Sequence, residues 1–218
     1  MSERILVREK ITSRNDEIAA ENRARLDAAG IFALNLMASP GAGKTALIEQ
    51  TVPRLLERFP IGVIDGDLAT TLDADRAARA GAVSVQINAA SCHLDAPMVS
   101  GGLDRLELDT LDLLLIENVG NLVCPASWEL GTHASVLIAS IPEGDDKPYK
   151  YPTMYRGVDV LVVNKIDLLP HLDFDMDRFR QGVEALNEEV ITFPLSCATG
   201  EGIEPWIAWI IEQLDTRS

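Results

Sequence analysis

The sequence predicts an α/β protein with a mostly parallel sheet, helices on both faces of it, and an N-terminal helical extension. Short apolar runs alternate with helical patterns along the 218 residues, which is typical of a parallel sheet that is covered on both sides. After the first run comes Ala38-Ser-Pro-Gly-Ala-Gly-Lys-Thr45, a phosphate-binding loop in the strand–loop–helix context that this motif requires. The fold class is therefore that of a P-loop NTPase.

The N-terminal segment precedes the first strand and has a helical pattern. Ser13 with Asp16 resembles a helix N-cap pair, and Gly30 would end the helix. The residues expected near one helical face are Ile18, Ala19, Asn22 and Leu26. We expect residues 1–29 to form an extension that packs against the domain formed by residues 30–218, or against a second subunit.

Apolar runs of strand length continue after the extension. They occupy residues 31–37, 61–64, 83–87, 113–116, 136–139, 158–163 and 190–194. Each is far shorter than a membrane span, so no membrane partner is expected. Ligands of such sheets bind at the carboxyl ends of the strands, where the motifs described below also lie.

Composition excludes some partners and favours one compartment. The net charge is −15, with 34 acidic and 19 basic residues, which argues against nucleic acid as a partner because phosphate backbones need a basic face. The three cysteines are an odd number without close pairing, as expected in a reducing environment. The first residues carry scattered charges and no apolar leader pattern, so we expect a cytoplasmic protein.

The phosphate-binding loop predicts specific roles. Its glycines let backbone N–H groups converge on phosphate oxygens at a helix N-terminus. Lys44 would reach the β- and γ-phosphates and act in catalysis, and the Thr45 hydroxyl would ligate Mg²⁺. The nucleotide-binding residues expected here are Gly41, Ala42, Gly43, Lys44, Thr45 and Ala46.

A second motif selects the base. In Asn164-Lys165-Ile-Asp167, the Asp167 carboxylate can accept two hydrogen bonds from N1–H and the 2-amino group of guanine, a pattern that adenine lacks. The loop after the last strand, Ser196-Cys197-Ala198, would place a backbone N–H against the guanine O6. The two motifs in this order indicate a GTP-binding domain.

Acidic residues follow two of the strands. Asp67 is the first candidate for contacting Mg²⁺ and Asp65 the second, while Asp73 and Asp75 are also compatible with a capped helix start. Glu117 ends the fourth strand, where it could bind a Mg²⁺-bound water or orient the attacking water; a structural turn is the alternative. The expected catalytic residues are Lys44, Asp67 and Glu117, and the expected Mg²⁺ ligands are Thr45, Asp67 and Glu117.

Cys92, His93 and Cys124 lie on loops at the same edge of the sheet. Two thiolates and an imidazole suit Ni²⁺ or Zn²⁺, although free cysteines are commonly buried packing residues. Three ligands would leave a coordination position for water, a substrate chain or a second copy of the protein. His133 and His171 have no evident partners and are expected on the surface.

Longer segments carry a family resemblance. They are Cys92-His-Leu-Asp-Ala96, Glu117-Asn-Val-Gly-Asn-Leu-Val-Cys-Pro125, Glu143-Gly-Asp-Asp-Lys-Pro-Tyr-Lys-Tyr-Pro152 and Asn15-Asp-Glu-Ile-Ala-Ala-Glu-Asn-Arg23. Through them the chain resembles the nickel-incorporation GTPases of nickel–iron hydrogenase maturation, the HypB family. The match runs over nearly the whole chain.

The resemblance implies an activity and partners. It implies slow hydrolysis of GTP to GDP, a homodimer in the GTP-bound form, and Ni²⁺ or Zn²⁺ binding by Cys92, His93 and Cys124 near the dimer interface. It also implies a small zinc-containing nickel metallochaperone (HypA) as partner and a hydrogenase large-subunit precursor as recipient. Two alternatives stay open: a GTPase of urease or cobalamin-enzyme maturation, and a metal-binding module with a vestigial nucleotide site.

Overall fold

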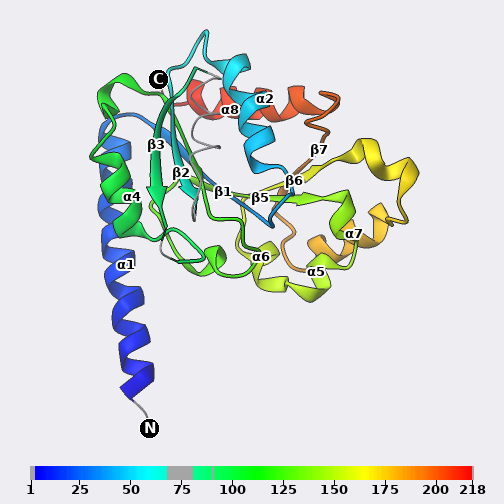
Figure 1. Cartoon of the computed structure of the whole chain (residues 1–218), viewed down its shortest axis with the longest axis horizontal. Helices are drawn as coiled ribbons and strands as arrows, with labels where there is room; N and C mark the ends of the chain where they lie inside the picture. The colour runs from blue at the N-terminus through cyan, green and yellow to red at the C-terminus, as the bar shows by residue number, and fades with distance from the viewer. Residues whose placement is uncertain (1–2, 68–80, 90, 218) are drawn as a thin grey trace.

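The protein is built around one parallel sheet (Figure 1). The computed structural model describes residues 3–67, 81–89 and 91–217, without the side chains of residues 3–11 and Asp67. Seven strands run in the order β3-β2-β4-β1-β5-β6-β7, and every neighbouring pair is parallel. Their bounds are β1 Phe32–Ala38, β2 Ile61–Asp67, β3 Val83–Asn88, β4 Leu113–Glu117, β5 Ala134–Ser140, β6 Val160–Asn164 and β7 Ile191–Pro194. All seven expected strands are confirmed.

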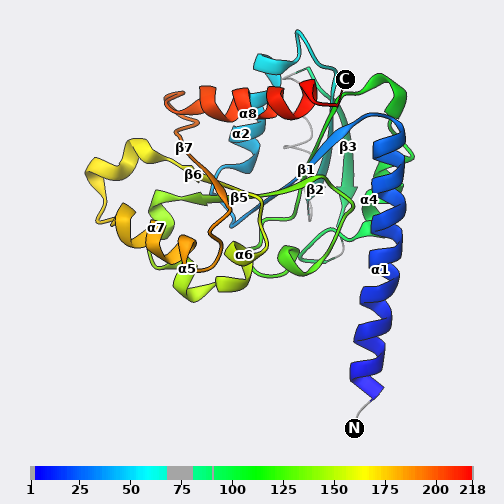
Figure 2. The same cartoon turned by 180° about the vertical axis from the view of Figure 1, so that it is seen from behind.

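The helices cover both faces of the sheet, as the sequence predicted. Helices α2 and α8 lie on one face, and α1, α4, α6 and α7 lie on the other (Figures 1 and 2). The helices are α1 Glu3–Ala28, α2 Lys44–Leu55, α4 Ala96–Leu103, α5 Lys147–Lys150, α6 Pro152–Arg156, α7 Met176–Glu184 and α8 Ile203–Asp215. Short 3₁₀ turns are η1 Leu108–Thr110, η2 Pro125–Ser127, η3 Ile141–Glu143 and η4 Ile166–His171.

The central strand β1 shows how the apolar pattern builds two cores. Its residues Phe32, Leu34 and Leu36 pack toward α2 and α8, whereas Ala33 and Met37 pack on the opposite side. Successive side chains of a strand point to opposite faces, so a strand buried on both sides reads as a continuous apolar run. Asn35 is a polar residue inside this apolar run and is only 3% exposed. A buried polar side chain at this position indicates a role other than apolar packing.

Helix α1 is longer than the sequence predicted. Ser13 lies inside α1, so the N-cap prediction for Ser13 and Asp16 is wrong. The nine residues before Thr12 contain neither glycine nor proline, so nothing there stops the helix from continuing to Glu3. Gly30 ends the helix as expected: it has φ +72°, its N–H donates to Asp27 O, and the Ile31 N–H donates to Leu26 O.

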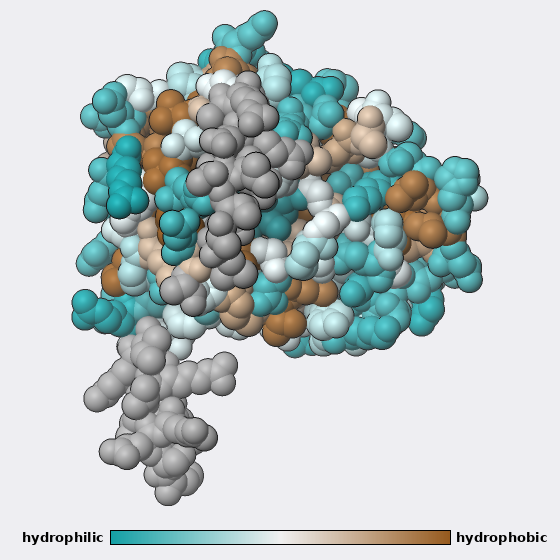
Figure 3. Space-filling view, viewed as in Figure 1, coloured by the Kyte–Doolittle hydropathy of each residue, from teal (hydrophilic) through white to brown (hydrophobic). Residues whose placement is uncertain are grey.

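Figure 3 shows the polarity of one face of the molecule. On the face in Figure 3, hydrophilic residues predominate and the apolar patches are small and scattered. Within the described part of the chain, no helix combines the length and the apolar character that crossing a membrane demands.

Candidate functional site

The phosphate-binding loop connects β1 to α2 with the backbone that the motif predicts. Gly41 has φ +77° and Gly43 has φ +108°, a region that residues with a Cβ rarely adopt. A Cβ at Gly43 would also overlap the amide of Asn164. Both conformational freedom and lack of volume therefore require glycine at position 43, and Lys44 begins the helix immediately afterwards.

A pocket of about 340 Å³ opens above this loop. Its polar lining combines a lysine with two carboxylates, those of Asp65 and Glu117. The residues that line it are Pro40, Gly41, Gly43, Lys44, Thr45, Ala46, Asp65, Gly66, Glu117, Asn118 and Gly120. An anion with several oxygens and an accompanying cation suit such a lining.

The oxygen donors for a cation lie side by side. The Thr45 hydroxyl donates to Glu117 Oε1 at 2.9 Å, and Asp65 is in register with Glu117 on the neighbouring strand. A hydroxyl and two carboxylates are hard oxygen donors, which fit Mg²⁺. The side chain of Asp67 and residues 73 and 75 lie outside the described residues, so those predictions stay untested.

The base-selecting motif is joined to the phosphate loop. The Asn164 amide donates to Ala42 O at 2.9 Å and accepts from the N–H groups of Lys165 and Cys197. The Lys165 ammonium donates to Gly41 O at 2.6 Å. One asparagine thus joins three segments of the chain: the phosphate loop, its own motif and the loop after β7.

The remaining base-loop residues take positions consistent with their expected role. The Ser196 hydroxyl donates to Asp167 Oδ1 at 2.5 Å, which orients the carboxylate expected to recognise guanine. Ala198 is exposed in the following turn. Burial raises the pKa of the Cys197 thiol to about 11, so this cysteine is a neutral packing residue at physiological pH.

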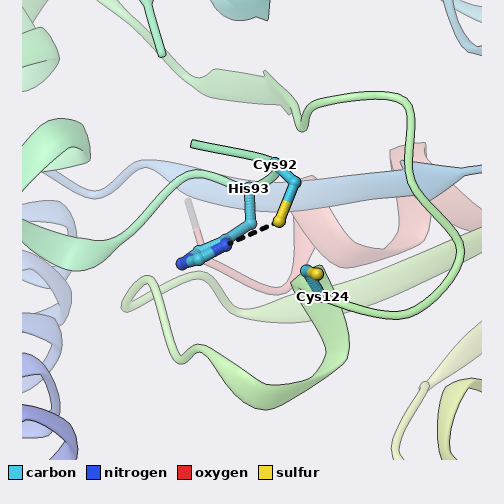
Figure 4. A group of neighbouring side chains, drawn as sticks. All are labelled: Cys92, His93 and Cys124. Carbon is cyan, nitrogen blue, oxygen red and sulfur yellow. Dashed lines mark hydrogen bonds between the residues drawn. The ribbon is translucent and has the colours of Figure 1, made fainter. Parts of the chain in front are cut away.

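Three potential metal ligands converge at the same end of the sheet (Figure 4). One ligand atom each from Cys92, His93 and Cys124 lies within 4.8 Å of the others. Cys92 Sγ is 3.7 Å from His93 Nδ1, and Figure 4 shows Nδ1 facing the sulfur while the far nitrogen points away. Two sulfurs and one imidazole nitrogen fit a borderline metal such as Ni²⁺ or Zn²⁺.

The surroundings of Cys124 and His93 favour the neutral forms of these two side chains. A hydrogen bond with Cys92, together with burial, raises the pKa of the Cys124 thiol. Burial lowers the pKa of His93, and Asp95 partly opposes that effect. The His93 ring stacks on Trp128 at a centroid distance of 4.6 Å. Metal binding by Cys124 would therefore release the proton of its thiol.

Segment 117–124 joins the two groups of residues. It begins with Glu117 in the nucleotide pocket and ends with Cys124 in the ligand cluster. Gly120 lies over the phosphate loop, where a Cβ would contact Pro40 and the Lys44 ammonium, and the Asn121 amide donates to Cys92 O at 3.3 Å. A displacement of this segment would move Glu117 in the nucleotide pocket and Cys124 in the cysteine–histidine cluster together.

Asn118 connects the end of β4 to the segment that carries Cys92 and His93, a role that was not predicted from the sequence. Its Oδ1 accepts from the N–H groups of Leu94 and Val119, each at 2.9 Å, and its amide donates to Asn35 Oδ1 at 3.1 Å. Asn118 is 1% exposed. The available signals in the sequence were Asn118 directly after Glu117 and Asn35 inside an apolar run. Neither signal identifies the hydrogen-bond partners, because these partners are distant in the sequence.

His133 is not the surface residue that was expected. Its side chain is 3% exposed, Nδ1 accepts from the Ala33 N–H at 2.9 Å, and Nε2 lies 2.8 Å from Asp27 Oδ1. The ring closes the gap between α1 and the start of the sheet, which no local pattern reveals. His171 is exposed, as expected.

The fold and the pocket define a P-loop nucleotide-binding protein that carries a cysteine–histidine cluster beside its nucleotide pocket. Residues 32–194 match the family described as CobW/HypB/UreG, nucleotide-binding domain. The hydrogenase maturation factor HypB of Azotobacter vinelandii is 46% identical, over 99% of this chain and 72% of that protein. The chain belongs to the HypB family.

Two relatives from Helicobacter pylori extend the comparison. The hydrogenase/urease maturation factor HypB of strain J99 is 38% identical, over 96% of this chain and 88% of that protein. The crystal structure of HypB from H. pylori in complex with nickel superposes with a TM-score of 0.88 at 36% identity. It covers 93% of this chain and 96% of its own.

Proposed function

We propose that the protein hydrolyses GTP and uses the nucleotide state to control a Ni²⁺ or Zn²⁺ ion during maturation of a nickel–iron hydrogenase. Segment 117–124 is the observation that carries this proposal, because it contributes to the nucleotide pocket and to the cysteine–histidine cluster at once. The nickel complex of the H. pylori relative supports nickel as the ion.

On the nucleotide side, each residue has a role that suits its position. Lys44 would contact the β- and γ-phosphates, and Asn164, Lys165 and Asp167 would hold the guanine base. Thr45, Asp65 and Glu117 would hold Mg²⁺, with Asp67 as a further candidate. When bound, Mg²⁺ neutralises phosphate charge. No arginine is among the described residues that line the pocket, and we expect slow hydrolysis, as the family resemblance implies.

On the metal side, Cys92, His93 and Cys124 would bind the ion and leave a position open. GTP would order the loops around Glu117, and hydrolysis would relax them and release the ion to the hydrogenase large-subunit precursor. The proposal includes a GTP-dependent homodimer, a HypA-type metallochaperone as partner, and a cytoplasmic location. It also divides the chain into an extension, residues 1–29, and a GTPase domain, residues 30–218.

Urease maturation is a second candidate recipient pathway. The H. pylori relatives carry both hydrogenase and urease in their names, which favours this possibility over cobalamin-enzyme maturation.

Complementation of a deletion strain tests the proposal. Lys44→Ala and Cys124→Ala are each expected to abolish hydrogenase activity, because both sites must act. Arg58→Ala, which removes an exposed pair with Asp215, is the control and should complement fully. Full complementation by Lys44→Ala would instead indicate a metal-binding module with a vestigial nucleotide site. Urease activity measured in the same strains distinguishes the recipients.

A further inference from the structure

Helix α1 contacts both segments that carry the cysteine–histidine cluster. Asn15 Oδ1 accepts from the Ala96 N–H at 2.9 Å, and the Asn15 amide donates to Glu129 O at 2.9 Å. Ala96 begins α4, directly after the Cys92–Asp95 segment. Glu129 follows Trp128, the residue on which His93 stacks.

Asn22 repeats this bridge two helical turns further along α1. Its amide donates both to Ala96 O at 2.9 Å and to Leu130 O at 3.1 Å. Residues at this spacing lie on one face of a helix. Asn15 is 3% exposed and Asn22 is fully buried, so these hydrogen bonds are shielded from water.

Helix α1 also lies close to the segment that follows Cys124 and Trp128. Gly131 has φ +90°, and a Cβ there would overlap Ala19 O and Asn22 Cβ of α1. In the described part of the structure, Asn22 Oδ1 has no hydrogen-bond partner. The Asn22 amide, in contrast, reaches two backbone carbonyls, and an apolar side chain would leave both carbonyls without this donor.

We propose that Asn15 and Asn22 are positioning residues for the cysteine–histidine cluster. They fix the distance between the segment that carries Cys92 and His93 and the segment that carries Cys124 and Trp128. The segment that carries Cys92 and His93 is then held by α1 on one side and by Asn118, next to the nucleotide pocket, on the other. This inference rests on the proposed role of the cluster in metal binding.

Metal titration of the full-length chain tests the inference. Asn15→Ala and Asn22→Ala are compared with wild type by titration with Co²⁺ and with Ni²⁺. The thiolate-to-metal charge-transfer absorption is recorded, and the Kd for each metal is obtained from it. Loss of partners that orient metal ligands commonly weakens affinity by about 10- to 100-fold, and we expect this range for both variants. Guanine nucleotide affinity should stay within about twofold, because neither residue reaches the pocket.

Asn187→Ala is the matched control. Asn187 also donates to two backbone carbonyls, Val158 O and Tyr155 O, but it lies in the loop between α7 and β7, away from the cysteine–histidine cluster. At a similar loss of Tm, it should leave metal affinity unchanged. An equal loss of metal affinity in Asn187→Ala, or no loss in folded Asn15→Ala or Asn22→Ala, overturns the positioning role. If Asn22→Ala does not fold, Asn15→Ala decides.

Cys124→Ala separates this inference from the proposed function. If Cys124→Ala binds both metals as tightly as wild type, the metal site itself is wrong and the positioning role fails with it. If Cys124→Ala abolishes binding and both asparagine variants bind normally, only the positioning role is wrong.

Discussion

At the scale of single residues, His133 gives stability a defined pH dependence. Burial lowers its pKa below the ordinary value of 6.5, and the hydrogen bond to Asp27 only partly opposes this shift. Because Nδ1 accepts from the Ala33 N–H, a proton there would break that hydrogen bond. The folded protein therefore keeps the ring neutral, with Nε2–H donating to Asp27.

The sign of the effect follows from proton linkage. Below about pH 6.5 the unfolded chain binds a proton at this histidine that the folded chain does not, so the free energy of unfolding falls as the pH falls. For one proton the slope is at most about 1.4 kcal/mol per pH unit. His133→Asn keeps an acceptor for the Ala33 N–H without titrating. Denaturant unfolding between pH 7.5 and 5 should show a shallower loss for this variant; identical slopes would show that His133 does not titrate in this way.

Asp167 is the residue that we propose selects guanine. Asp167→Asn replaces one acceptor with a donor, which suits the 2-carbonyl of xanthine rather than the 2-amino group of guanine. Losing a charged hydrogen bond is worth about 1.5–3 kcal/mol, so GDP affinity should fall at least about tenfold while xanthosine diphosphate binds more tightly than to wild type. Competition binding measures both affinities. Unchanged preference for GDP would place guanine elsewhere.

At the scale of elements, Asn118 connects the strand end in the nucleotide pocket to the segment before α4. Asn118→Ala leaves the buried N–H groups of Leu94 and Val119 without this partner, which should cost about 1–3 kcal/mol of stability. The nucleotide state should then alter metal affinity less than in wild type, because the ligand segment no longer follows β4.

The measurement is the ratio of Ni²⁺ Kd values in the GDP-bound and GTP-analogue-bound states. For Asn118→Ala this ratio should approach one, and for Asn187→Ala, destabilised at a distance, it should equal the wild-type ratio. A wild-type ratio in Asn118→Ala would mean that coupling takes another route.

The elements also show how far the sequence could be interpreted. The strands were predictable because parallel strands buried on both faces form continuous apolar runs, and the phosphate loop because its glycines have few alternatives. The start of α1 was not, since no residue before Ser13 breaks a helix. The roles of Asn15, Asn22 and Asn118 depend on partners distant in sequence, which local patterns do not reveal.

The sequence predicted the members of the cysteine–histidine cluster but not the residues that surround them. Residue types and strand ends placed Cys92, His93 and Cys124 at one edge of the sheet, and their convergence within 4.8 Å agrees. Stacking of Trp128 on His93 was not foreseen. The burial of His133 was missed because a single histidine in a polar loop gives no periodic signal.

At the scale of the whole molecule, the nucleotide pocket and the cysteine–histidine cluster share segment 117–124 at one end of the sheet. The phosphate loop and the base motif are joined through Asn164, the ligand segment is held by Asn118, and α1 supports it from the far side. A structure of this kind can link nucleotide and metal without a separate regulatory domain. Such coupling must be reciprocal in binding free energy.

The central claim is therefore tested most directly by the Ni²⁺ affinity of wild-type protein loaded with GDP or with a GTP analogue, measured together with the nucleotide affinity in the absence and presence of Ni²⁺. We predict that the two Ni²⁺ Kd values differ by a factor of about 5 to 150, and that Ni²⁺ shifts the ratio of nucleotide affinities by the same factor. Equal Ni²⁺ affinity in the two nucleotide states would contradict it.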